Sequence, residues 1–156
     1  MQEIINLVNP KGEVIGSIEK LEAHEKGLLH EAFSIFIFNK NKEILLQKRA
    51  LTKYHSGGLW TNTCCSHPRA GEDLNISVHR RMVEEMGFDI EYIKKVYNFI
   101  YNVSLDKGLI EHEYDHVMVG EYNDEIINPN PEEVCDYKWV SMEWLKKDVE
   151  INPQNY

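Results

Sequence analysis

Residues 72–88, EDLNISVHRRMVEEMGF, show the clearest helical periodicity in the chain. Residues spaced three and four apart form one helical stripe, which consists of Ile76, His79, Val83 and Met86. Asn75 is a candidate N-cap, and Gly87 is suited to end the helix because glycine adopts the left-handed conformation at low cost. The stretch therefore predicts a helix that closes at Gly87.

On both sides of this helix the chain has patterns typical of strands. Pairs of predicted strands lie around turns in residues 3–20, 32–50 and 94–122, the last with its turn at 106–108. Residues 128–133, NPNPEE, predict a loop, followed by a strand at 135–141 and a short helix at 142–148. We therefore expect one α+β domain over residues 1–156, with a mixed, mostly antiparallel sheet and a few helices packed on it.

The composition restricts the class of function. The chain of 156 residues has 26 acidic and 17 basic side chains and a formal charge of −9, which disfavours binding to nucleic acid or an anionic membrane. The sequence contains neither a membrane-length apolar run nor a signal-peptide pattern, so we expect a cytoplasmic protein. Three cysteines are an odd number and predict reduced thiols.

A row of carboxylates lies in the predicted strand at residues 109–119. Alternation places Glu111, Glu113 and Asp115 on one face of that strand. A solvated face of an antiparallel sheet is the simpler explanation for such a pattern. The functional alternative is a divalent cation, which relieves the repulsion between neighbouring carboxylates.

Several histidines and cysteines are further candidates for a metal or reactive site. His24 and His30 enclose a glycine, which suits a loop that brings both imidazoles together, although surface histidines would give the same pattern. In an extended stretch at 63–68, Cys65 and His67 point to one side and Cys64 to the other. Cys64 is then a buried apolar side chain, whereas a cation near Cys65 would lower the pKa of its thiol.

Charged pairs also recur on the predicted helix. Arg80 precedes Glu84 by four residues, and Arg81 precedes Glu85 by the same interval. Ordinary surface ion pairing explains this spacing for an isolated helix. Because Glu72 lies shortly before the helix, the alternative is that all three carboxylates contribute to one site.

These residues resemble the sequence box of the Nudix superfamily, G-x5-E-x7-R-E-U-x-E-E-x-G-U, where U is aliphatic. Its first glutamate matches Glu72, its arginine Arg80, and its last conserved positions Glu84, Glu85 and Gly87. Ser66 replaces the first glycine, and Arg81 replaces the glutamate that follows the arginine. An arginine in place of a magnesium-binding glutamate argues against diphosphate hydrolysis.

The departures are similar to one branch, the type I isopentenyl-diphosphate isomerases. WTNTCCSHP at 60–68, AHEKGLLH at 23–30 and EHE at 111–113 occur in that family's order and approximate spacing. The resemblance implies a Nudix fold and movement of a double bond between isopentenyl and dimethylallyl diphosphate. Members usually continue into an aromatic segment after the position of Tyr156, so it also implies a domain without this C-terminal segment.

The resemblance assigns roles to particular residues. It implies catalytic roles for Cys65, Glu113 and Tyr101. It implies a divalent site for manganese, zinc or magnesium, with the ligands His24, His30, His67, Glu111 and Glu113. Contact with the substrate diphosphate is implied for Lys20, Arg49, Lys53 and Arg81. A magnesium ion bound with that diphosphate would be held by Glu85.

Two other classes of function stay open at this level. A Nudix hydrolase of nucleoside diphosphate compounds would use the same box. A metal-binding or thiol-sensing module would keep the scaffold without turnover. The predicted partner is a small isoprenoid diphosphate, and the sequence leaves the oligomeric state undefined.

Overall fold

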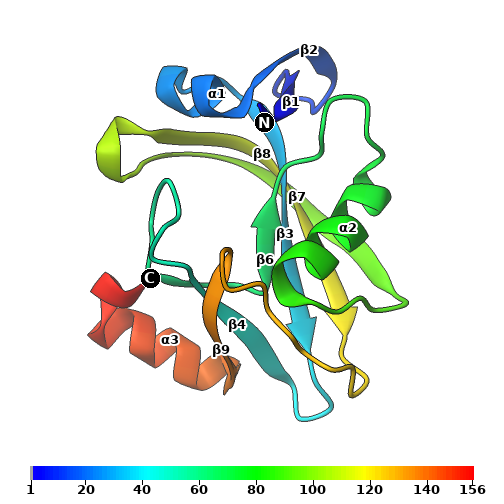
Figure 1. The fold of residues 1–156 in the computed structure, drawn as a ribbon, viewed down its shortest axis with the longest axis vertical. Helices are drawn as coiled ribbons and strands as arrows, with labels where there is room; N and C mark the ends of the chain where they lie inside the picture. The colour runs from blue at the N-terminus through cyan, green and yellow to red at the C-terminus, as the bar shows by residue number, and fades with distance from the viewer. Residues whose placement is uncertain (1) are drawn as a thin grey trace.

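The computed structural model describes residues 2–156, which form a strongly curled mixed sheet surrounded by three α-helices (Figure 1). The elements are β1 (Ile4–Val8), β2 (Val14–Glu19), α1 (Lys20–Lys26), β3 (His30–Phe38), β4 (Glu43–Arg49), β5 (Trp60–Thr61), β6 (Cys64–Ser66), α2 (Leu74–Met86), β7 (Ile93–Ser104), β8 (Ile110–Glu121), β9 (Val134–Ser141) and α3 (Met142–Ile151). Short 3-10 turns occupy Asp106–Gly108 and Pro153–Asn155. The predicted strands and both predicted helices are present.

Strand β3 is the centre of the sheet. It pairs antiparallel with β1, β4 and β6 and parallel with β8, while β7 pairs antiparallel with β8. The predicted hairpin of β3 and β4 pairs at Phe38 and Ile44 and then opens, because β4 continues alongside β9. The sheet is therefore mixed and mostly antiparallel, as predicted.

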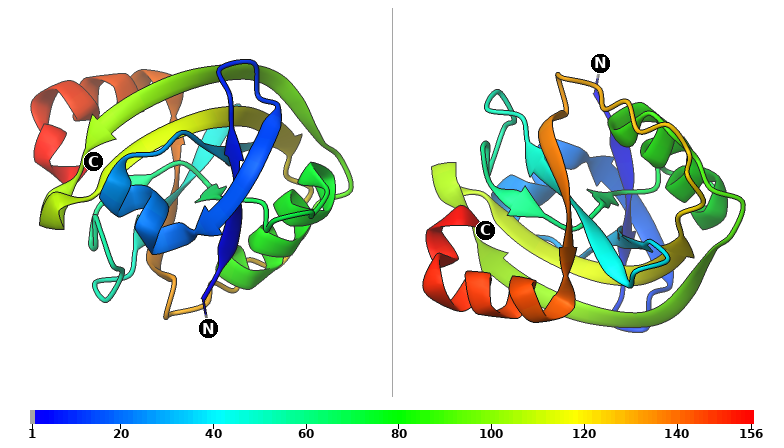
Figure 2. Two further views of the ribbon diagram at one scale, coloured as in Figure 1. Left: turned by 90° about the horizontal axis from the view of Figure 1, so that it is seen from above. Right: turned by 90° about the horizontal axis from the view of Figure 1, so that it is seen from below.

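The two faces of the sheet build two apolar layers. Phe33, Ile35 and Ile37 of β3 pack in one cluster with α2 residues such as Met82, whereas Phe36 and Phe38 belong to a second cluster that includes residues of α3. This follows from the alternation of side chains along a strand. Helices α2 and α3 accordingly lie on opposite sides of the curled sheet (Figure 2), which confirms the α+β prediction.

Helix α2 ends where the sequence predicts but begins earlier. Gly87 is the left-handed C-cap with φ of 72°. The N-cap is Asp73 rather than Asn75, because the Asp73 carboxylate accepts hydrogen bonds from the amides of Asn75 and Ile76 at 2.9 and 3.3 Å. Aspartate at an N-cap satisfies amides that have no partner within the helix.

The stripe that predicts α2 is not the buried face of the helix, although Met86 belongs to both. Ile76 and Val83 are 64% and 50% exposed. The face turned inward instead consists of Ser77, Val78, Met82, Glu85 and Met86. Sequence periodicity weighs apolar residues alone, whereas this buried face includes a serine and an ion-paired glutamate.

The predicted loop around His24 and His30 is also corrected. His24 lies on α1, a helix capped by Glu19 and ended by the left-handed Gly27, and His30 is the first residue of β3. Their ring centroids are nevertheless 4.8 Å apart, so the expected approach of the two imidazoles occurs. No helix within residues 2–156 has the length and apolar character required to cross a membrane.

Candidate active site and metal centre

A cavity of about 500 Å³ lies where α1, α2 and the long β7–β8 ribbon meet the loop between β4 and β5. Ten of the residues predicted for the site line it, namely Lys20, Arg49, Lys53, Cys65, His67, Arg81, Glu85, Tyr101, Glu111 and Glu113. The other two, His24 and His30, are fully buried beside His67. The fold thus brings all twelve into one region.

The two glutamates of β8 share a tyrosine from the neighbouring strand. Pairing of β7 with β8 sets Tyr101 opposite Glu113. The hydroxyl of Tyr101 lies 2.7 Å from Glu113 Oε2 and 3.2 Å from Glu111 Oε2. Burial, together with the charge of Glu113, raises the pKa of Glu111 to about 7. The predicted alternation along β8 is confirmed.

Three imidazoles converge on Glu113. Nδ1 of His24 lies 2.7 Å from the carbonyl oxygen of Lys20, and Nδ1 of His30 lies 2.8 Å from that of Leu28. These contacts require a proton on Nδ1 and leave Nε2 with a free lone pair. His67 Nε2 lies 3.2 Å from both His30 Nε2 and Glu113 Oε1.

This cluster fits a divalent cation. One ligand atom from each of His24, His30, His67 and Glu113 lies within 4.8 Å of the other three. Burial lowers the pKa of His24 to about 4 and also lowers that of His67, which keeps these imidazoles neutral. The buried Nε2 of His24 has no hydrogen-bond partner in the described part of the chain. Inward-facing neutral imidazoles with protonated outer nitrogens are the donor set of a nitrogen-binding metal site.

Glu111 meets the cluster through a histidine that the sequence reasoning missed. Its carboxylate forms a second group with His24, which is one of the four residues above, and with His55. His55 lies in the β4–β5 loop, where periodicity carries no information on the direction of a side chain. Only the proximity of His55 to His24 in three dimensions identifies it as a site residue, and a single sequence does not show that proximity.

The two adjacent cysteines take the separate positions expected for them. Cys64 is fully buried in the apolar cluster beneath α2, and its thiol donates to Glu85 Oε2 at 3.0 Å. Cys65 faces the cavity, where its thiol donates to Asn62 Oδ1 at 2.8 Å. The Asn62 amide is oriented by donating to the carbonyl oxygens of Ile35 and Cys64. Asn62 was another residue that the sequence reasoning missed.

The expected lowering of the Cys65 pKa depends on a nearby cation, and the protein groups alone shift this pKa in the opposite direction. Burial, followed by the charge of Asp115, raises the pKa of Cys65 to about 12. Ser34 Oγ lies 3.7 Å from the sulfur and donates to Asp115 Oδ2 at 2.6 Å, so the Asp115 carboxylate lies on the same side of the cavity as the thiol. A carboxylate near a thiol opposes the formation of thiolate. The protein groups alone therefore favour the protonated thiol.

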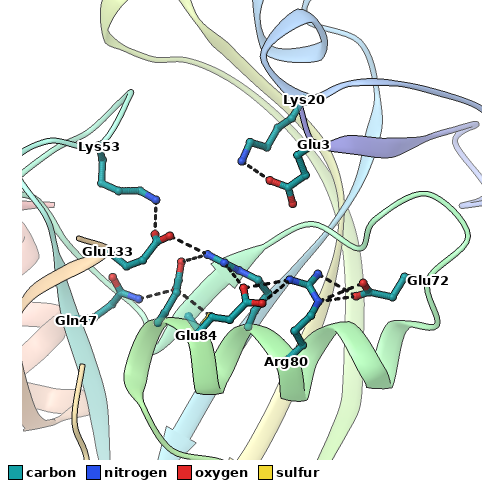
Figure 3. A network of polar contacts seen from close by, with 11 residues as sticks. Glu3, Lys20, Gln47, Lys53, Glu72, Arg80, Glu84 and Glu133 are labelled. Carbon is teal, nitrogen blue, oxygen red and sulfur yellow. Dashed lines mark hydrogen bonds and ion pairs between the residues drawn. The ribbon is translucent and has the colours of Figure 1, made fainter. Parts of the chain in front are cut away.

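Basic side chains enter the cavity within a network of ion pairs (Figure 3). Lys20 pairs with Glu3 and Lys53 with Glu133. Arg81 contacts Glu84 at 2.6 Å. The fourth basic residue differs, since Arg49 donates two hydrogen bonds to the carbonyl oxygen of His55.

The glutamates of the predicted box are joined by arginines rather than left free. Arg80 binds Glu72 at 3.0 Å and Glu84 at 3.1 Å, so the residue before α2 does share a site with the end of the helix. Glu85 is 4% exposed, and Arg81 donates to its Oε1 at 2.7 Å. Its Oε2 accepts from Gln47.

Comparison with known proteins agrees with this fold. Residues 28–156 match the NUDIX domain family. A solved structure from Deinococcus radiodurans superposes with a TM-score of 0.79 at 17% identity, covering 96% of this chain and 90% of that one. A MutT protein from Methanosarcina mazei gives a TM-score of 0.61 at 22% identity over 78% and 81%. The chain belongs to the Nudix superfamily.

Full-length relatives define the branch. The isopentenyl-diphosphate Delta-isomerase 2 of Photorhabdus laumondii is 53% identical over all of this chain and 87% of its own length. The isopentenyl-diphosphate Delta-isomerase of Photobacterium profundum is 46% identical over 97% of this chain and 84% of its own. Within the superfamily, the chain belongs to the type I isopentenyl-diphosphate Delta-isomerases.

Proposed function

We propose that the protein interconverts isopentenyl and dimethylallyl diphosphate, with Cys65 and Glu113 as the two proton-transfer groups. The assignment of these two residues rests on one observation. Cys65 on β6 pairs in register with Ser34, and Glu113 on β8 pairs with His30, so the two side chains reach one cavity from strands on either side of β3.

The chemistry requires two such groups. Protonation of the terminal alkene carbon of isopentenyl diphosphate produces a tertiary cationic state, and removal of a proton from the carbon on the other side of that centre completes the isomerisation. The group that donates in one direction accepts in the reverse direction. The Tyr101 hydroxyl, 2.7 Å from Glu113 Oε2, holds that carboxylate in place. Walls such as Phe99 and Trp60 limit access of water, which would react with the cation.

A divalent ion at the histidine cluster supports this arrangement. His24, His30, His67, Glu111 and Glu113 would hold it, and the ion would supply positive charge that offsets the two glutamates. His67 and His30 lie with Nε2 at 3.2 and 3.6 Å from Glu113 Oε1, and these contacts orient the carboxylate. Manganese, zinc and magnesium are the candidate ions, and the nitrogen-rich donor set favours manganese or zinc.

The diphosphate end of the substrate fits the basic side of the cavity. Lys20, Arg49, Lys53 and Arg81 line it. Glu85 would share a magnesium ion with the diphosphate. Its carboxylate accepts from Arg81, Gln47 and Cys64, which leaves room for one more contact among about four lone-pair directions.

The first prediction concerns the two proton-transfer groups. In heavy water, the parent is expected to incorporate deuterium into isopentenyl diphosphate during isomerisation. Cys65→Ala and Glu113→Gln are expected to lower kcat by at least about 100-fold, since each removes an acid or base that acts in the transition state. Mass spectrometry of the recovered diphosphates measures both exchange and isomerisation.

Matched controls separate chemistry from folding. Cys135→Ala changes an exposed thiol on β9, and Glu121→Gln changes an exposed carboxylate at the end of β8. Both are expected to retain the parent's kcat. Exchange and isomerisation at the parent's rate in Cys65→Ala would contradict the assignment of that thiol. Metal content is measured for Glu113→Gln, because the same carboxylate is a proposed ligand.

The residues at the positions of the Nudix box argue against a nucleotide hydrolase. Arg81 stands where such an enzyme has a magnesium-binding glutamate, and its guanidinium also pairs with Glu84. Release of phosphate from nucleoside diphosphate compounds by the purified protein, without isomerase activity, would favour the hydrolase instead. Metal binding without any response to isoprenoid diphosphates would favour a non-catalytic module.

A further inference from the structure

His55 is a buried histidine whose position suggests a role in the metal centre. Its exposed fraction is 6%, although it lies in the loop between β4 and β5. That loop projects toward the turn of the β7–β8 ribbon (Figure 1), where the amide of Ser56 donates to Asp106 Oδ1 at 3.0 Å. The loop is therefore fixed at both its base and its tip, and His55 points inward.

The ring nitrogens of His55 have different surroundings. Nδ1 lies 3.0 Å from the hydroxyl oxygen of Ser56, and Nε2 lies 3.6 Å from Glu111 Oε1. His24 and His30 show the same pattern, in which Nδ1 is occupied by a polar partner and Nε2 faces the cluster. Occupation of the outer nitrogen is typical of histidines that bind a metal through the inner one.

The distances among His24, His55 and Glu111 are compatible with one coordination sphere. Ligand atoms of His24, His55 and Glu111 all lie within 4.8 Å of one another. Octahedral bonds of about 2.1 Å separate neighbouring ligand atoms by about 3 Å and opposite ones by about 4.2 Å. A separation of 3.6 Å between His55 and Glu111 falls between these values. Small side-chain movements would bring both groups onto one ion.

The position of His24 bears on whether the two clusters form one metal centre or two. It belongs to the cluster with Glu113 and also to the cluster with Glu111. Its Nδ1 is occupied by the Lys20 carbonyl, so Nε2 is the atom available to both clusters. One Nε2 has one lone pair and binds one ion. The sharing of His24 therefore favours a single centre over two.

We propose that His55 is a fourth imidazole ligand of this centre and binds the ion through Nε2, next to Glu111. The inference rests on the metal site of the proposed function and extends its ligand set. It has a consequence for substrate binding, because the His55 carbonyl accepts two hydrogen bonds from Arg49 and the same loop carries Lys53. Metal binding would then fix two of the basic residues of the diphosphate site.

Metal binding in the absence of substrate tests the inference. Chelator-treated parent, His55→Ala and His55→Gln are titrated with Mn²⁺ by calorimetry and with Co²⁺ by visible absorption. The parent is expected to bind one ion per chain. Both variants are expected to bind about 10- to 100-fold more weakly, with an altered Co²⁺ spectrum. Added imidazole is expected to restore part of the affinity of His55→Ala, which a purely structural role would not allow.

His112→Gln is the matched control. His112 is next to Glu111 in sequence, but its ring contacts the carbonyl of Gly27, and the control is expected to keep the parent's affinity and spectrum. Parent-like affinity and spectrum in both His55 variants would overturn the role of His55 and leave the proposed function intact. Two ions per parent chain would overturn the single centre. No binding by the parent would instead overturn the metal site of the proposed function.

Discussion

At the scale of single residues, neighbours in sequence acquire different chemistry from different surroundings. Alternation in an extended segment was enough to predict that Cys64 is buried and Cys65 faces the site. The upward shift that the protein groups give the Cys65 pKa was not predictable, because it depends on burial and on the charge of Asp115, which lies on another strand. Local pattern gives the direction of a side chain, whereas its electrostatic environment comes from contacts distant in sequence.

A second prediction concerns Asp115 and pH. It is 2% exposed, and burial raises its pKa from 3.8 to about 7. The pKa in the folded protein is above that in the unfolded chain, so the stabilisation is complete below about pH 4 and is lost as the pH rises through 7. Asp115→Asn removes this dependence. Between about pH 5 and pH 8 the free energy of unfolding of the parent should fall relative to that of the variant, on the order of 2 kcal/mol.

Urea unfolding of both proteins in the presence of a chelator measures this difference. Asp124→Asn is the control, because the Asp124 side chain is 83% exposed and should leave the pH dependence unchanged. Identical pH dependence in the parent and Asp115→Asn would show that Asp115 is ionised across this range.

At the scale of elements, the local sequence predicts the C-terminal end of α2 better than it predicts which face of the helix is buried. The sequence predicted the C-terminal end correctly, since Gly87 has the left-handed φ of 72°. A Cβ at this position would lie 1.9 Å from the carbonyl oxygen of Asn128. Gly87 is therefore required both by its own conformation and by the backbone of the loop that packs against it.

This contact gives a third prediction, for Gly87→Ala. The left-handed conformation costs a non-glycine residue about 1–2 kcal/mol, and the clash with backbone adds to it, so the free energy of unfolding should fall by about 3 kcal/mol or more. Gly71→Ala is the matched control, because Gly71 has φ of 78° with nothing within 4 Å of a Cβ. A loss of about 1 kcal/mol is expected there. Equal losses in chemical denaturation would argue against the contact with Asn128.

At the scale of the whole molecule, the proposed metal centre connects segments far apart in the sequence. Its residues come from α1, β3, the segment after β6, and β8. Parallel pairing of β3 with β8 sets His30 beside Glu113, and antiparallel pairing of β3 with β6 positions the segment that carries His67. An ion at this centre would hold the sheet to α1, and binding would stabilise the entire fold.

The fourth prediction follows from this linkage. Chelator-treated protein titrated with Mn²⁺ to about 100 times its Kd should gain about 2.7 kcal/mol in stability. For a chain of this size, this corresponds to a rise in Tm of about 5–10 °C. Scanning calorimetry measures the shift. His67→Gln should abolish most of it, and the same rise in that variant would indicate that the ion binds elsewhere.

The sequence by itself determined the strands and helices, the α+β class, the left-handed end of α2 and the alternation that sends Cys65, Glu111 and Glu113 into the site. These features depend on neighbours within a few residues, and turn residues and periodicity record such interactions. Resemblance of the assembled motifs to one family added the function and the residue roles.

The tertiary structure decided which face of α2 is buried, where His24 lies, the pKa of Cys65, and the approach of His55 to Glu111. Each depends on groups brought together by strand pairing and loop packing rather than by local propensity. Burial of Glu85, for example, requires Arg81 from its own helix and Gln47 from β4. Apolar periodicity alone does not predict a buried carboxylate whose partners are assembled only by the complete fold.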